Sequence, residues 1–467
     1  MMKKRIISLL LALACIFSTG LTVTAQDTTA PDTTTDSETT VPEETTAPET
    51  ERLPTIAEGE EIILEMPTLV NVDAAVVYNI ENDRYIYDLN ADKVIYPAST
   101  VKLMTAIVAI ELLDGDLDRE ITVPGDALKR VSGNNIALKQ DEIMSARELL
   151  YALLCGNAND AANVLAYTLA GGIEEFVALM NEKAQELGAV NTHYTNPTGL
   201  HDDEMVTTAR DTALIAAHAY KTSPITDMST ATVHRFAETN KAGERTLHNK
   251  NHFFSTVTEY IYKWDIPRGL NAGYTNEGGY CLATTVARDG LTYVVVTMGA
   301  KRDDKYIYSY TEAAKLIKWA LYAYEYKTVL STSDMICEIP VKLSGKTDYV
   351  TLFPSHNVEL YLPTGTDVDS EIGLEWTLTK DYFTAPVSEG EVGGRVTISY
   401  NGMSVGTYDL VTRNSVNRDN ILYVLDLIKG VTGTRAFKVI ATIAGIGFVG
   451  YIAVLAYVTF NRGKRKK

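Results

Sequence analysis

The stretch that decides the fold is Tyr96-Pro97-Ala98-Ser99-Thr100-Val101-Lys102-Leu103-Met104-Thr105. Pro97 precedes an apolar run that continues to Leu113, and this order predicts the start of a helix. Residues three apart lie on the same helix face, so Ser99 and Lys102 are expected to point the same way. A serine hydroxyl becomes a nucleophile when a lysine of lowered pKa takes its proton. The pair is therefore a candidate acyl-transfer site, although an N-cap serine and a surface lysine would have the same spacing.

The residues around this pair, Pro-Ala-Ser-x-x-Lys-x-Met-Thr, resemble the nucleophile segment of the D-alanyl-D-alanine carboxypeptidases, the low-molecular-weight penicillin-binding proteins. The resemblance covers roughly residues 70–410. It implies an α/β (α+β) fold, a penicillin-binding/β-lactamase-like peptidase domain with an antiparallel sheet and helices. It also implies that Ser99 attacks the penultimate D-Ala carbonyl and that Lys102 is its base. The backbone N–H groups of Ser99 and Tyr274 would hold the oxyanion.

Two further segments resemble family motifs in altered form. The second family motif is a Ser-Gly-Asn loop followed by Asp-Ala-Ala, and we match it to Cys155-Gly156-Asn157, with Cys155 in place of the serine. The third motif is Lys-Thr-Gly on the strand beside the cleft, and we match it to Asn271-Ala272-Gly273, which Tyr274 follows. The resemblance implies that Cys155 passes a proton to the leaving amine and that Asn157 fixes the peptide. Residues 271–274 would bind the terminal carboxylate of the substrate.

These motif changes leave two functions open. Intact Ser99, Lys102 and Asn157 favour a serine-type carboxypeptidase that acts on peptidoglycan stem peptides and is covalently inhibited by β-lactams. The changes at 155, 271 and 272 favour a catalytically impaired relative that binds cell-wall peptides or a partner protein. We favour the carboxypeptidase because the acylating pair is unaltered. A β-lactamase would share this pair, but the sequence has no Glu-x-x-Leu-Asn segment for deacylation.

Both ends of the chain carry segments that indicate export and anchoring. Residues 1–25 are predicted to be a signal peptide, with a basic start, an apolar core and small residues at the cleavage site. Residues 26–60 are rich in Thr, Pro and Glu and are expected to be a disordered linker. Residues 439–460 are uncharged and apolar, long enough to cross a bilayer, and the basic tail 461–467 follows them. The sequence therefore predicts a cell-membrane protein with a single span, external domains and a cytoplasmic C-terminus.

Between these ends the hydrophobic pattern predicts two domains. Residues 61–328 form the peptidase domain, and residues 329–415 have short alternating strands that predict a small β-sandwich. A juxtamembrane segment, 416–438, follows. Within the first domain we expect strands at 73–89 and 279–299. Helices are expected at 141–154, at 160–169 and near 311–325.

Charge, cysteine and histidine patterns narrow the classes of partner. The formal net charge of −18 makes nucleic acid an unfavourable partner. Three of the four cysteines lie beyond the predicted signal peptide, and this odd number argues against a disulfide framework. His248 and His252 have no third ligand at a metal-binding spacing, so we expect a loop or surface role for them. The sequence predicts neither a metal nor a cofactor.

Overall fold

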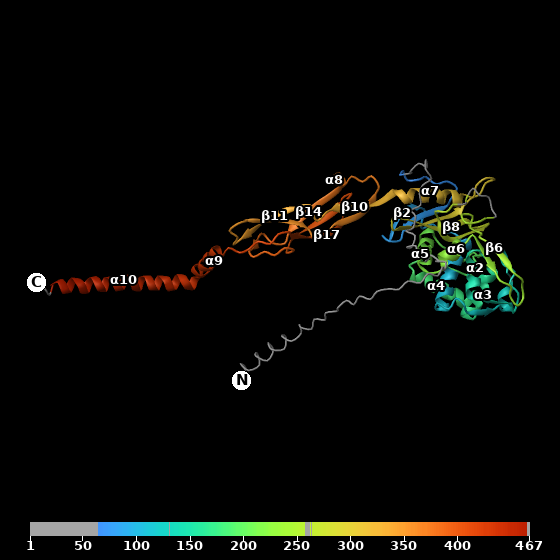
Figure 1. Ribbon diagram of the computed structural model, residues 1–467, viewed down its shortest axis with the longest axis horizontal. Helices are drawn as coiled ribbons and strands as arrows, with labels where there is room; N and C mark the ends of the chain where they lie inside the picture. The colour runs from blue at the N-terminus through green and yellow to red at the C-terminus, as the bar shows by residue number, and fades with distance from the viewer. Residues whose placement is uncertain (1–63, 130, 257–261, 263, 465–467) are drawn as a thin grey trace, which may run out of the picture. The chain divides into compact units, whose positions relative to one another are not determined.

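The computed structural model describes residues 64–129, 131–256, 262 and 264–464 (Figure 1). The predicted signal peptide and linker therefore lie outside the described residues. The first domain is built on an antiparallel sheet of five strands in the order β2-β1-β9-β8-β7. Its strands are β1 (Ala74–Asn79), β2 (Arg84–Leu89), β7 (Arg268–Thr275), β8 (Gly279–Arg288) and β9 (Leu291–Ala300). This confirms the antiparallel sheet and the strands expected at 73–89 and 279–299.

Both faces of this sheet are covered, which explains why its central strands are apolar throughout. In β1, Ala74 and Val76 belong to one buried cluster, whereas Ala75 and Val77 belong to another. Successive side chains of a strand point to opposite faces, so the two clusters lie on opposite sides of the sheet. Helix α7 (Tyr308–Ala323) covers one face and the remaining helices of the domain cover the other (Figure 1).

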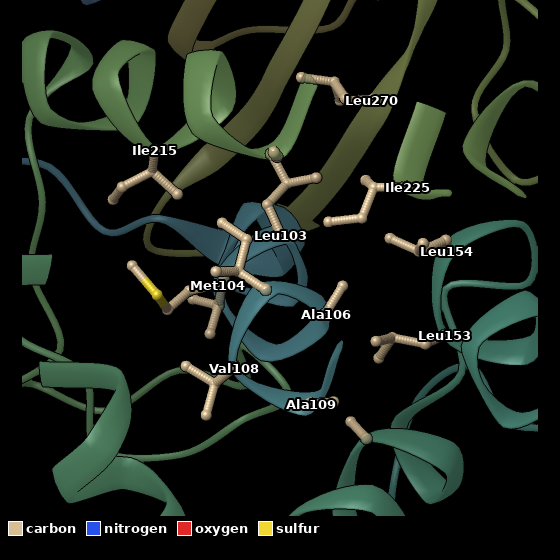
Figure 2. Packing of buried hydrophobic residues seen from close by; sticks show 14 of the residues in the cluster. Leu103, Met104, Ala106, Val108, Ala109, Leu153, Leu154, Ile215, Ile225 and Leu270 are labelled. Carbon is tan, nitrogen blue, oxygen red and sulfur yellow. The ribbon is translucent and has the colours of Figure 1, made fainter. Parts of the chain in front are cut away.

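Helix α1 (Val101–Leu113) lies at the centre of the helical layer. Its neighbours are α2 (Ala146–Leu154), α3 (Asn159–Ala170), α4 (Ile173–Glu186), α5 (Ala209–Lys221) and α6 (Ile225–Thr230). Figure 2 shows Leu103 and Met104 of α1 packed among side chains of α2, α5, α6 and residue Leu270. A helix that is apolar on all sides is stable only when it is buried on all sides. Lys102 belongs to this helix and is consequently fully buried.

The helix predicted at 141–154 begins later than expected. Residues Ile143–Ser145 form strand β4, which pairs with β3 (Glu120–Thr122). Ser145 then caps helix α2, because its hydroxyl accepts a hydrogen bond from the Glu148 N–H at 3.2 Å. A second hairpin, β5 (Val233–Phe236) with β6 (Arg245–His248), was not predicted. The helices expected at 160–169 and near 311–325 are present as α3 and α7.

The second domain is a β-domain, as predicted. Its strands form a pair, β10-β13, and a six-stranded sheet in the order β14-β16-β17-β12-β11-β15 around one buried cluster. The strands are β10 (Tyr324–Leu330), β11 (Cys337–Lys342), β12 (Tyr349–Pro354), β13 (Val358–Pro363), β14 (Ile372–Leu378), β15 (Phe383–Thr384), β16 (Val392–Tyr400) and β17 (Met403–Thr412); a short helix, α8 (Val368–Glu371), precedes β14. The boundary predicted at 328 falls within β10.

Two helices follow the β-domain, α9 (Asn420–Gly433) and α10 (Arg435–Lys464). Asp419 caps α9, since its carboxylate accepts hydrogen bonds from the N–H groups of Ile421 and Leu422. Within α10, the segment Arg435–Thr459 has a mean hydropathy of 2.3 and is long enough to cross a membrane. Its apolar side chains are exposed rather than packed in a core.

Candidate active site

Ser99 lies in a tight turn at the N-terminal end of helix α1. Residues Ala98–Thr100 form a single 3₁₀ turn, and the Thr100 hydroxyl donates to the Pro97 carbonyl at 2.7 Å. Ala98 has a φ of 50°, a left-handed conformation that is uncommon for a residue with a side chain. Such strain persists only where surrounding contacts hold the backbone in place, and it is frequent next to reacting groups.

Lys102 is positioned to take the Ser99 proton. Its Nζ lies 3.2 Å from Ser99 Oγ and 2.6 Å from the carbonyl oxygen of Thr198. The side chain is fully buried, and burial lowers the pKa of Lys102 from 10.5 to about 7. Near neutral pH a substantial fraction of this lysine is therefore an uncharged amine. An uncharged amine can accept the proton of the adjacent hydroxyl.

Two glycines allow the backbone to pack tightly around the nucleophile. A Cβ atom on Gly273 of β7 would lie 2.8 Å from Ser99 Cα, and one on Gly199 would lie 3.0 Å from the same atom. The turn that carries Gly199 is fixed by Asn196, whose Oδ1 accepts hydrogen bonds from the N–H groups of Thr198 and Gly199 at 3.1 and 2.9 Å. The site therefore depends on close contact between the Ser99 turn, β7 and the 196–199 turn.

A cavity of about 490 Å³ lies beside β7 on the side of the loop before α3. Its walls come from β7, from the end of β6 with the residues after it, and from residues 134–135 and 156–157. Of the predicted site residues, Asn157, Ala272, Gly273 and Tyr274 line this cavity, and Gly273 connects it to Ser99. Ser99 and Lys102 are not part of this wall, so the cavity is a candidate substrate site that reaches the nucleophile only through Gly273.

Asn157 and Cys155 have different surroundings. The Asn157 side chain lines the cavity, and its Nδ2 donates to the Ala272 carbonyl of β7 at 3.1 Å, while its Oδ1 has no partner among the described residues. The Cys155 thiol is fully buried, is not part of the cavity wall and donates to the Ala231 carbonyl at 3.2 Å. Burial raises the pKa of Cys155 to about 12. This placement does not fit the predicted role of Cys155 as a proton donor to the leaving group.

The predicted carboxylate-binding residues offer no charge. Asn271 is 2% exposed, and its Nδ2 has no hydrogen-bond partner among the described residues. Ala272 provides only its backbone, and the half-exposed Tyr274 donates its hydroxyl to Asn276 Oδ1 at 2.9 Å. The segment 271–274 therefore has polar groups but no cation for an anionic substrate group.

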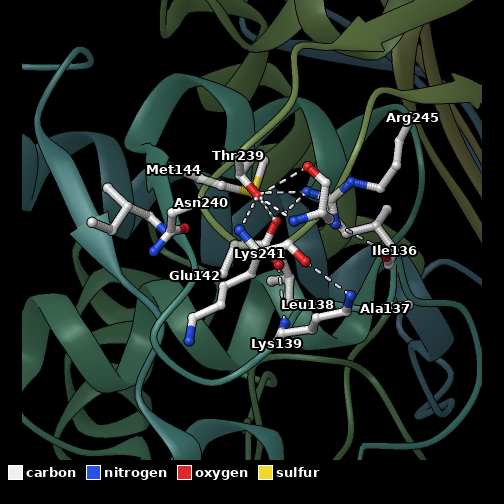
Figure 3. Close-up of polar contacts among 12 residues, drawn as sticks. Ile136, Ala137, Leu138, Lys139, Glu142, Met144, Thr239, Asn240, Lys241 and Arg245 are labelled. Carbon is white, nitrogen blue, oxygen red and sulfur yellow. Dashed lines mark hydrogen bonds and ion pairs between the residues drawn. The ribbon is translucent and has the colours of Figure 1, made fainter.

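A buried ion pair joins two segments that line the cavity. Arg245, the first residue of β6, contacts Glu142 with an Nη2–Oε1 distance of 2.5 Å, and Glu142 is completely buried. Figure 3 shows this pair together with Thr239, whose hydroxyl donates to Glu142 at 2.8 Å. Arg245 Nη1 also donates to the Ile136 carbonyl at 3.2 Å. The pair therefore fixes β6 to the 134–142 loop, although neither residue carried a sequence signal for this role.

Comparison with known proteins agrees with this site. The sequence pattern described as D-alanyl-D-alanine carboxypeptidase matches residues 63–302. The chain belongs to the D-alanyl-D-alanine carboxypeptidase family. The pattern described as the C-terminal domain of penicillin-binding protein 5 matches residues 324–418, which include the whole β-domain. The family predicted from the motifs is thus confirmed, and with it an enzyme of the serine carboxypeptidase type.

Individual carboxypeptidases match along most of their length. The chain is 26% identical to the D-alanyl-D-alanine carboxypeptidase DacF of Bacillus subtilis over 362 residues, 76% of this chain and 89% of that protein. It is 26% identical to DacC of Escherichia coli over 378 residues, 78% of this chain and 88% of that protein. The crystal structure of penicillin-binding protein 5 from Haemophilus influenzae has a TM-score of 0.54 at 25% identity and covers 76% of this chain and all of that one. DacD from Francisella tularensis, at 22% identity and a TM-score of 0.57, supports the fold.

The carboxypeptidase motif order explains the surroundings of Cys155. The family's Ser-Gly-Asn is directly followed by Asp-Ala-Ala, and in this chain Asn157-Ala158-Asn159 is directly followed by Asp160-Ala161-Ala162. Placing Asn157, instead of Cys155, at the serine position matches the cavity lining. Asn159 Nδ2 then donates to the Ser132 carbonyl at 2.7 Å, and the Asp160 carboxylate accepts from the N–H groups of residues 136 and 138. These contacts favour a register of the second motif two residues later than the one matched from the sequence, and we propose this later register.

Three cavity-wall residues at the end of β6 and after it were not assigned to the site from sequence. His248 was expected in a loop or on the surface, yet it ends β6 and lines the cavity together with Lys250 and His252. No family motif includes these residues, so only the fold of the β5–β6 hairpin brings them to the cavity.

Proposed function

We propose that this chain is a serine-type D-Ala-D-Ala carboxypeptidase that removes the terminal D-Ala from peptidoglycan stem peptides. The observation that carries the proposal is the contact between Ser99 and the buried Lys102 at 3.2 Å. This pair is the acyl-transfer unit of the family to which the chain belongs. Because the amine is fully buried, it can serve as a base at neutral pH.

In the first step, Ser99 Oγ forms a bond to the penultimate D-Ala carbonyl carbon while Lys102 takes the hydroxyl proton. Backbone N–H groups of Ser99 and Tyr274 would stabilise the oxyanion. The carbon–nitrogen bond then breaks, and the leaving D-Ala amine receives a proton. An ester between Ser99 and the shortened peptide remains. Water attacks this ester, loses a proton to the site, and releases the peptide carboxylate with Ser99 restored. A β-lactam would form the same kind of ester at Ser99.

We further propose that the enzyme is anchored in the cell membrane by residues 439–460 and that both domains lie outside the cytoplasm. The apolar segment within α10 and the basic residues after it support this orientation. If the orientation is correct, protease added to intact protoplasts removes the two domains and leaves a C-terminal epitope intact. A digested epitope with protected domains would reverse the assignment.

A second function is favoured by the altered motifs. Asn157, Asn271 and Ala272 replace family side chains that act on the leaving group and the substrate carboxylate. A chain with these changes could bind wall peptides without efficient turnover. The nucleophile and its base, however, are both present, and a binding protein alone does not require them.

One experiment separates these functions. The full chain, solubilised in detergent, is incubated with a labelled penicillin, and the adduct is mapped by mass spectrometry. We expect one adduct on Ser99, and no adduct after Ser99→Ala. Release of D-Ala from an acyl-D-Ala-D-Ala peptide is measured in parallel. An adduct on another residue would refute the assignment of Ser99, whereas an adduct on Ser99 without D-Ala release would favour the impaired relative.

A further inference from the structure

We propose that the Lys250 ammonium binds the terminal carboxylate of the peptide substrate and so replaces the third-motif lysine that this chain lacks at position 271. This inference rests on the proposed function, because it assigns a specificity-determining residue to the same reaction. It concerns a residue outside the family motifs, on the segment that follows β6.

The need for a cation arises from the third motif. In the family, a lysine and a threonine at the positions of Asn271 and Ala272 bind the substrate carboxylate. Here the segment 271–274 carries no charge, and the Asn271 amide is 2% exposed. A carboxylate moved from water into a cavity without a cation loses hydration that neutral groups replace only in part. A cation elsewhere in the cavity wall would remove this deficit.

The backbone of Lys250 is held by hydrogen bonds, whereas its ammonium group has no partner among the described residues. Its N–H donates to the Cys155 carbonyl at 3.0 Å, and the adjacent Asn249 is buried and donates to the carbonyls of Ser229 and Ala231 at 2.8 Å each. The Lys250 side chain lines the cavity and is exposed. Among the described residues, its ammonium makes no hydrogen bond or ion pair. The lysine is therefore held beside the cavity while its charge remains available.

The charges around the cavity favour an anion near Lys250. None of the described residues that line the cavity is Asp or Glu, although the whole chain has a net charge of −18. Burial raises the pKa of the Cys155 thiol, and the positive charge of Lys250 partly opposes that rise. The Lys250 charge is therefore close enough to affect the residues at the start of the 155–157 loop. Asn157, on the same loop, has a buried Oδ1 without a partner among the described residues. This oxygen can accept an N–H of a bound peptide while Lys250 binds its carboxylate.

The test compares two substrates that differ only in charge. Full-length wild type, Lys250→Gln and Lys250→Arg are assayed on an acyl-D-Ala-D-Ala peptide and on the same peptide with its C-terminus amidated. We expect Lys250→Gln to lower kcat/KM about tenfold to a hundredfold on the acid and less than about threefold on the amide, since one charge-assisted contact is lost. Lys250→Arg, which keeps the charge, should retain most of the activity. Lys221→Gln, at the exposed end of α5 and outside the cavity wall, is the matched control and should change neither rate.

A binding measurement tests the role of Lys250 independently of the proposed carboxypeptidase activity. In the Ser99→Ala background, calorimetry should show weaker binding of the acid peptide after Lys250→Gln and unchanged binding of the amide. If wild type releases no D-Ala but this difference in binding is found, the proposed carboxypeptidase activity fails and the role of Lys250 stands. If Lys250→Gln affects acid and amide equally, or affects neither, the role of Lys250 is refuted.

Restoring the third motif provides a second test. The pair Asn271→Lys with Ala272→Thr places the family's cation back on β7. With that cation present, the additional loss caused by Lys250→Gln on the acid peptide should fall to about threefold or less. An undiminished loss in this background would show that Lys250 acts independently of the carboxylate and would refute the inference.

Discussion

Gly199 lies directly against the carbonyl group of Ala98, the residue that precedes the nucleophile. A Cβ atom on Gly199 would overlap the Ala98 carbonyl oxygen and would lie 3.0 Å from Ser99 Cα. Because the neighbouring Thr198 carbonyl accepts the hydrogen bond of Lys102, the same turn contacts the nucleophile and orients its base. The left-handed Ala98 and the 196–199 turn therefore keep each other in place.

Substitution of Gly199 tests this relationship. We expect Gly199→Ala to lower the rate of penicillin acylation by about a hundredfold or more, because misplacement of reacting atoms by even about 1 Å costs this much. Gly199 has a φ of 74°, so part of any loss of stability comes from backbone strain. Gly171→Ala is the matched control, since Gly171 has a φ of 88° but no atom within 4 Å of an added Cβ. Comparable acylation by the two variants would contradict the steric account.

The rate of acylation should depend on the protonation of Lys102. Burial lowers the pKa of Lys102 to about 7, and only the uncharged amine can act as the base. We therefore expect kcat/KM to rise with pH through about pH 7 and to level off above it. A pH profile of acylation by a penicillin without titrating groups in this range measures the midpoint. A midpoint near the ordinary lysine value of 10.5 would contradict the assignment.

The free energy of unfolding should depend on pH because of the same buried lysine, Lys102. The folded-state pKa is about 7 and the ordinary value is 10.5, so between these pH values the unfolded chain binds more protons. The free energy of unfolding contributed by this group therefore rises with pH in that window. In Lys102→Met this dependence is removed, so the stability of the variant relative to wild type should decline from pH 7 to pH 10. Urea unfolding of both proteins across this range measures the difference, and parallel curves would refute the prediction.

The proposed register of the second motif is tested by a pair of substitutions. Cys155→Ala removes a buried thiol that is absent from the cavity wall, so it should change kcat/KM by less than about threefold while costing about 1 kcal/mol of stability. Asn157→Ala removes a side chain that reaches β7 across the cavity, and it should lower kcat/KM at least tenfold. The opposite ranking would restore Cys155 to the site.

The Glu142–Arg245 pair should contribute strongly to the stability of the cavity wall. Glu142→Gln leaves a partly buried guanidinium without its partner charge and should lower the free energy of unfolding by about 3 kcal/mol. Asp118→Asn breaks the exposed Arg147–Asp118 pair and is the control, with an expected cost below about 1 kcal/mol. Equal costs for both substitutions, measured by urea unfolding, would show that the buried pair has no special role.

The sequence was informative where one short segment determines the structure. The spacing of Ser99 and Lys102 on one helix is a local property, and the predicted contact between them is present at 3.2 Å. The strands at 73–89 and 279–299 were predictable because short apolar runs bounded by turn residues are local as well. The start of α2 was misplaced because Ile143–Ser145 looks helical in isolation but pairs with β3.

Other features depend on contacts between distant segments. The sequence alone favoured Cys155-Gly156-Asn157 as the second motif, because this tripeptide differs from Ser-Gly-Asn at one position only, whereas we now propose a register two residues later. The position of Asp160-Ala161-Ala162 directly after Asn159 already favours the later register, and the cavity lining and the hydrogen bond from Asn157 to β7 add structural support. Lys250 carried no sequence signal, since it comes together with residues 272–274 of β7 only in the wall of one cavity.

The pairing of β1 with β9 has a consequence for the timing of activity. Ala74 pairs with Met298 and Val76 with Val296, so the first strand of the domain to be synthesised can pair with β9 only after nearly the whole domain has been made. Pairing between such distant segments is slow compared with the formation of local structure. Ser99 emerges early, but Gly273, which packs against it, emerges much later. If the chain is exported as proposed, it should be inert while it is being translocated, and it should act on the proposed peptide substrate only after the whole first domain has arrived.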